Sequence, residues 1–124
     1  MSMISTTNPI SDGLDELTLA IAAEGVPYVT RDLHAFHPDP VGVLVSSPTI
    51  TSMQLASITF EVTVYVVSAD PPSSRTLDRI LAVVLPVMDA TQTGTARPTT
   101  WNAGGSLADL PAYEITTTMT VPNL

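Results

Sequence analysis

The sequence predicts an α+β domain in which two helices pack on one face of a mostly antiparallel sheet. Residues 57–68 alternate apolar and polar side chains with a period of two, which indicates a strand with one face in a core. Residues 10–21 and 77–88 carry apolar side chains at helical spacing instead. Because the segments follow one another as helix, strands, helix, strands, this arrangement is the simplest one.

Residues 8–12 predict the start of the first helix, where Ser11 or Asp12 can cap the free amide groups. Gly25 is a natural C-terminal stop. Residues 26–31 read as a short extended run at a sheet edge. The apolar stripe of the helix comprises four residues: Ile10, Leu14, Leu17 and Ile21.

The middle of the chain predicts a loop over residues 32–40 and a strand over 41–46. Residues 47–56 form either a long hairpin arm or a loop. Residues 57–68 form the longest strand. Its inward face is expected to comprise Ile58, Phe60, Val62, Val64 and Val66.

The second helix is expected to begin at Ser73 or Ser74, and Pro86 should kink or loosen its last turn. Its buried stripe is expected to comprise Leu77, Ile80, Leu81, Val84 and Met88. Two further strands follow, over residues 97–102 and from about 111 onward, separated by a turn at 103–106. The inward face of the last strand should comprise Tyr113, Ile115, Met119 and Val121.

Composition limits the classes of function. The 124 residues are the length of one domain, so we expect a single domain over 1–124 with a flexible N-terminal segment at 1–9. The absence of cysteine excludes disulfides and thiol chemistry. The sequence contains twelve acidic residues, four scattered arginines and no lysine, so its net charge is −8. Nucleic-acid binding through a basic patch and attachment to anionic membranes are therefore not expected.

Catalytic or metal-binding motifs are not evident. Asp32, His34, His37 and Asp39 are ligand types for a divalent cation, but the neighbouring prolines place them in a surface loop. The sequence has no Gly-x-Ser-x-Gly motif and no lysine for a phosphate-binding loop. We expect no catalytic residue, no cofactor and no metal.

The best candidates for protein contacts are apolar and aromatic. Ile50, Met53 and Leu55 lie in an uncharged segment between two strands, where a solvated arm would normally carry charge. Trp101 and Tyr65 are interpreted either as packed side chains or as interface anchors.

Four segments together carry a family resemblance. They are GVLV (42–45), TFEVTVYVVS (59–68), SRTLDRIL (74–81) and ARPTTW (96–101). Taken in this order, they resemble the tail terminators (minor tail proteins) of long-tailed bacteriophages, especially those of high-GC hosts, whose genomes favour arginine over lysine. The resemblance covers most of the chain from about residue 10.

The resemblance implies a structural protein of the virion neck. It implies a homo-oligomeric ring of six subunits, assembled in the host cytoplasm, that caps the tail-tube protein and offers a surface to the head-completion or connector protein. It brings no catalytic or cofactor residues. Two alternatives remain open: another neck component (a head-closure or tail-completion protein) or a tube subunit, and a small dimeric α+β-barrel enzyme or ligand-binding protein that uses His34 or His37 in a cleft.

Overall fold

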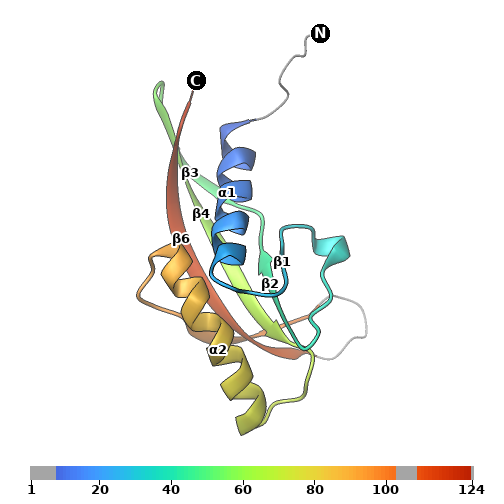
Figure 1. The fold of residues 1–124 in the computed structure, drawn as a ribbon. Coiled ribbons are helices and arrows are strands. Elements are labelled where there is room, and N and C mark those ends of the chain that lie inside the picture. Colours follow the sequence, from blue (N-terminus) through green and yellow to red (C-terminus); the bar gives the residue numbers. More distant parts are fainter. Residues whose placement is uncertain (1–7, 103–108, 124) are drawn as a thin grey trace.

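A computed structural model of the protein describes residues 8–102 and 109–123. Both helices lie on the same side of one twisted sheet, which confirms the predicted α+β class (Figure 1). The expectations for residues 1–7 and for a turn at 103–106 lie outside the described residues. The elements are α1 (Pro9–Ala23), β1 (Val29–Thr30), the short 3₁₀ helix η1 (Leu33–Ala35), β2 (Val41–Val45), β3 (Thr49–Met53), β4 (Ser57–Ser68), α2 (Ser74–Thr91), β5 (Arg97–Trp101) and β6 (Leu110–Pro122).

The sheet is built around the antiparallel pair β4 and β6. The strand order is β1-β2-β4-β6-β5, and β1 pairs with β2 in parallel at one edge. Strand β6 runs along one side of β4, from Ser57 opposite Pro122 to Val67 opposite Ala112. The other side of β4 is shared between β2 and β3. The segment after β2 is therefore a paired hairpin arm, not a loop.

The main core lies between the helices and the sheet. Phe60, Val62 and Ile115 from the central strands are fully buried there. Gly13 allows α1 to approach closely, because a Cβ at this position would lie 3.0 Å from Val121 Cγ1 and 3.5 Å from Phe60 Cζ. The core residues from α1 are Leu14, Leu17 and Ile21, as predicted.

The start of α1 differs from the prediction. Asn8, not Ser11 or Asp12, is the N-cap, and its Oδ1 accepts a hydrogen bond from the Ser11 amide at 2.7 Å. Pro9 is the first helical residue, where its fixed φ favours the helix and its missing N–H has no cost. Asn8 and Pro9 therefore belong to the helix start and not to a flexible segment. Gly25, with φ of 93°, follows the helix end as expected.

The buried face of α2 is rotated from the predicted one. Ile80 and Val84 are buried as predicted, but Leu77 is 41% exposed, and Leu81 and Met88 are half-buried. The buried residues of the helix are Thr76, Ile80, Val84, Val87 and Thr91. The predicted buried stripe of α2 was wrong because it included only apolar residues, whereas Thr76 and Thr91 belong to the buried face.

Threonine is buried in this core because its hydroxyl finds a backbone acceptor. The Thr76 hydroxyl donates to the Pro71 carbonyl at 2.7 Å, and the Thr91 hydroxyl donates to the Val87 carbonyl at 2.9 Å. On β6, the buried Thr117 donates to the Thr91 carbonyl at 3.3 Å. Hydrogen-bonded hydroxyls avoid the cost of burying an unpaired polar group.

A second, smaller core lies on the opposite face of the sheet. It comprises Phe36, Leu44, Val67 and Ala112, with Tyr28, Tyr65, Trp101 and Leu110 packed against it. The segment 32–40 covers this face, so all five residues of β2 are buried and that end of the outer face is not solvated. The Tyr28 hydroxyl holds segment 32–40, the cover of the second core, in place. It donates to the Ala35 carbonyl and accepts from the His37 amide at 3.1 Å.

Gly42 is the point at which this cover meets the sheet. A Cβ there would lie 2.9 Å from Phe36 Cε1, 3.0 Å from Tyr28 Cδ2 and 3.1 Å from Pro38 Cα. The Tyr28 and Phe36 rings stack at 6.0 Å, so neither ring can move without disturbing the other. The second core therefore requires glycine at this position.

We predict that Gly42→Ala destabilises the protein by about 1–3 kcal/mol, because the two rings and the loop backbone must shift. Gly94→Ala is the matched control, since its Cβ would meet nothing within 4 Å; it should change the free energy of unfolding by no more than about 0.5 kcal/mol. Urea denaturation measures both. Equal stability of the two variants would contradict the assigned packing.

The C-terminal ends of the two helices bring two carboxylates together. Repulsion by Asp89, in the last turn of α2, raises the pKa of Glu24 at the C-cap of α1; desolvation and a hydrogen bond between the two groups raise it further. Neither helix has a basic residue in its last turn. Negative charge at a helix C-terminus is also opposed by the helix dipole.

We predict that Glu24→Gln raises the melting temperature at pH 7. The folded pKa lies above the unfolded value, so this pair costs stability when both groups are charged. That cost falls as the pH drops through the raised pKa, and it is absent below the ordinary value of 4.5. Thermal denaturation from pH 7 to pH 4 should show the difference from the unmodified protein shrinking. Glu16→Gln, which removes one charge from the same helix, is the control; an identical pH profile for both variants would refute this explanation.

Candidate interaction surface

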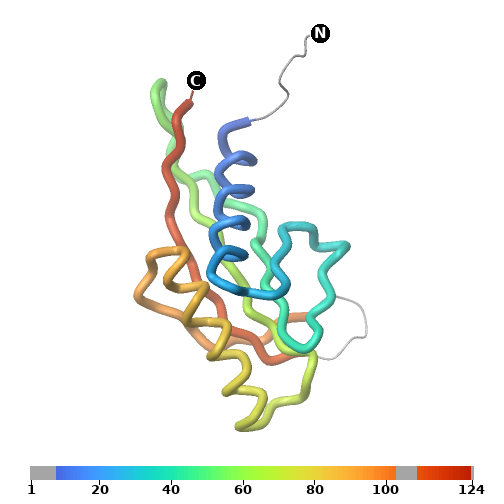
Figure 2. The backbone as a smooth tube through the Cα atoms, in the orientation of Figure 1, coloured from blue at the N-terminus to red at the C-terminus, as the bar shows by residue number. Residues whose placement is uncertain are grey.

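The hairpin of β3 and β4 projects at one end of the sheet, beside the C-terminal end of β6 (Figure 2). Its turn is closed by a hydrogen bond from the Gln54 amide to the Ser57 carbonyl at 2.8 Å. Asn123 holds the turn in place: its amide donates to the Ala56 carbonyl at 3.1 Å, and its Nδ2 donates to the Gln54 carbonyl at 2.9 Å. The hairpin therefore has a defined position even though it is exposed.

Three apolar side chains of the hairpin face solvent. Ile50 is 55% exposed, Met53 is 70% exposed and Leu55, in the turn, is 98% exposed. No residue between 47 and 60 is charged. We call Ile50, Met53 and Leu55 the hairpin surface.

The register explains why apolar residues stand on this strand. Ile50 lies opposite Phe60 and Met53 opposite Ile58, so both share the face of the sheet that forms the main core. Phe60 and Ile58 are buried on β4, whereas β3 lies one strand further out, at the edge. The apolar face of the sheet thus extends beyond the part that the helices cover.

The other two candidate residues lie elsewhere. Tyr65 and Trp101 are half-buried on the opposite face, against the second core, and the Trp101 ring packs edge-on against Phe36 at 5.1 Å. Together with the exposed Leu33 and with Arg31 they line a shallow recess of about 340 Å³. The structure does not bring the five predicted contact residues into one surface.

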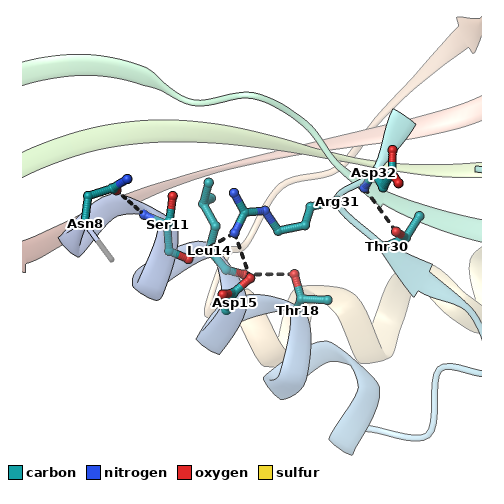
Figure 3. A network of polar contacts seen from close by, with 8 residues as sticks. All are labelled: Asn8, Ser11, Leu14, Asp15, Thr18, Thr30, Arg31 and Asp32. Carbon is teal, nitrogen blue, oxygen red and sulfur yellow. Dashed lines mark hydrogen bonds and ion pairs between the residues drawn. The ribbon is translucent and has the colours of Figure 1, made fainter. Parts of the chain in front are cut away.

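Arg31 links this recess to the first helix (Figure 3). Its guanidinium forms an ion pair with Asp15 at 2.7 Å and donates to the Ser11 carbonyl at 3.1 Å. Both charged side chains are substantially exposed, so the pair contributes little to stability. Its role is to orient the segment after β1 against α1.

A third surface was not predicted from the sequence. The start of α2 and the adjoining ends of β5 and β6 enclose a groove of about 370 Å³, at whose side Leu77 is exposed. We call it the proline groove, because three prolines line it: Pro72, Pro98 and Pro111. Because the sequence prediction placed Leu77 in the core, it did not identify the groove.

The histidine segment does not form a cation site within the described part of the chain. His34 and His37 are exposed, and Asp32 is used to cap η1 by accepting from the His34 amide at 3.0 Å. No three His, Cys, Asp or Glu side chains among residues 8–102 and 109–123 are grouped so as to hold a metal ion. Within the same ranges, no helix has the length and apolarity needed to cross a membrane.

Comparisons with protein-family models, curated proteins and solved structures give no match to the chain. The tail-terminator resemblance therefore stays a prediction. The three surfaces described above are the features of the molecule that bear on its function.

Proposed function

We propose that this protein is a structural subunit of a phage tail, a tail terminator whose copies form a ring at the head-proximal end of the tail tube. The observation that carries the proposal is the hairpin surface. It presents three apolar side chains in a segment, residues 47–60, that carries no charge, in a chain whose net charge is −8. Such a surface favours burial against another protein.

The rest of the proposal follows from the resemblance of the sequence segments. Six subunits would form the ring, and the hairpin would lie against the next subunit or the tail-tube protein. The opposite side of the ring would meet the head-completion or connector protein. No enzymatic step, cofactor or metal belongs to this role.

The open edge of β3 supports an assembly role in a second way. Among the described strands, β3 pairs only with β4, so one side of its backbone is free. A free, uncharged edge strand with apolar side chains tends to associate with other chains. Charge and proline commonly protect such an edge, and β3 has neither, although a bulge between Ile50 and Ser52 interrupts its pairing with β4.

We predict that the double variant Ile50→Asp and Met53→Asp folds but does not assemble. Both side chains lie outside the core, so the circular dichroism spectrum should be unchanged. In an interface, each aspartate would be a buried charge without a partner, which costs several kcal/mol. Native mass measurement should give a monomer where the unmodified protein gives a ring.

The matched control is Leu19→Asp with Leu85→Asp. These two side chains are similarly exposed, on the outer faces of α1 and α2, and the net charge changes by the same amount. The control should keep the ring. A ring that survives in the hairpin variant would show that the hairpin is only a loop, and loss of the fold would show that it belongs to the core.

A further inference from the structure

The proline groove is an apolar site open to a partner. Its lining contains no charged residue, and Ile80, which is buried, contributes to it together with the exposed Leu77 and the half-buried Tyr113. Proline has no backbone N–H, so covering the walls formed by Pro72, Pro98 and Pro111 leaves no donor unpaired at those positions. The groove is therefore suited to apolar side chains that bring no charge.

The hairpin surface and the proline groove lie at opposite ends of the central ladder. The hairpin turn lies beside Pro122, because Ser57 pairs with that residue. The groove includes Ala112, which pairs with Val67 at the other end of β4. Ten residues of β6 separate the two ends, a distance of about 33 Å. A hairpin cannot reach the groove of its own chain.

The charge of the protein restricts how two copies can meet. With a net charge of −8, two copies repel one another overall, so contact is favoured where charge is absent. The hairpin from residue 47 to 60 and the lining of the groove are both free of charge. Contact between these two surfaces buries apolar area without placing a carboxylate in the groove lining.

We propose that the proline groove of one copy receives the hairpin turn of a second copy, with Leu55 inserted beside Leu77. This inference rests on the proposed assembly role and names the surface on the neighbour that the hairpin contacts. The contact is heterologous, because different surfaces of the two copies meet. Repetition of such a contact yields a ring when the rotation closes, and an open filament when it does not.

The absence of cysteine allows a direct test by cross-linking. Two single variants, Leu55→Cys and Leu77→Cys, carry tags of different size and are mixed under oxidising conditions. A disulfide forms only when the two Cα atoms approach within about 7 Å. We expect a cross-linked product of mixed size. The control mixture pairs Leu55→Cys with Leu19→Cys, on the outer face of α1, and should give no such product.

Each outcome is decisive. A mixed product above the control level supports the proposal. A protein that assembles by native mass but gives no mixed product overturns the groove assignment and leaves the proposed function intact. Efficient cross-linking of Leu55→Cys to itself indicates a symmetric contact between hairpins and also overturns the groove assignment. A protein that stays monomeric at all concentrations contradicts both this inference and the proposed ring.

A second variant tests the groove without cysteine. Leu77→Asp should weaken assembly about tenfold or more, because it removes an apolar contact and places a charge in the groove. Leu85→Asp, on the same helix and more exposed, should leave assembly unchanged. Circular dichroism checks that both variants fold. Equal assembly of the two would refute the placement of the hairpin in the groove.

Discussion

The ladder between β4 and β6 is the constraint on which the rest of the structure depends. Eleven consecutive residue pairs fix its register. Because side chains alternate along a strand, this register directs Phe60 and Ile115 toward the helices and Val67 and Ala112 toward the second core. The ladder is also longer than the part that the helices cover. Apolar surface is therefore left exposed at the hairpin end, whereas at the other end the start of α2 reaches the strands and encloses the proline groove.

Much of this fold could be predicted from local patterns. The alternation in β4, the stripe of α1 and the stop at Gly25 depend on near neighbours in the chain, and all three were confirmed. The lack of charge in 47–56 pointed to the hairpin surface for the same reason. The second core escaped prediction because Phe36 reaches Leu44 only through a loop closed by long-range contacts. The groove escaped because buried, hydrogen-bonded threonines rotate α2 away from its most apolar face.

Charge and edge protection together favour a few surfaces for the proposed association. Acidic residues are absent from segment 47–60 of the hairpin and from the groove lining. Two of the edge strands also differ: β5 carries Pro98 within the strand, whereas β3 contains no proline and no charge. Proline in an edge strand blocks further pairing, and an unprotected edge invites it. The hairpin side is thus the edge at which we expect a neighbour.

In the proposed assembly, a neighbouring subunit covers the hairpin, which the monomer core does not need. Backbone amide hydrogen exchange tests it most directly, compared between the assembled protein and the protein diluted to monomer. The account predicts that amides of residues 49–56 exchange quickly in the monomer and slowly after assembly, while those in the centre of β4 are slow in both. Equal exchange of residues 49–56 in the two states would contradict it.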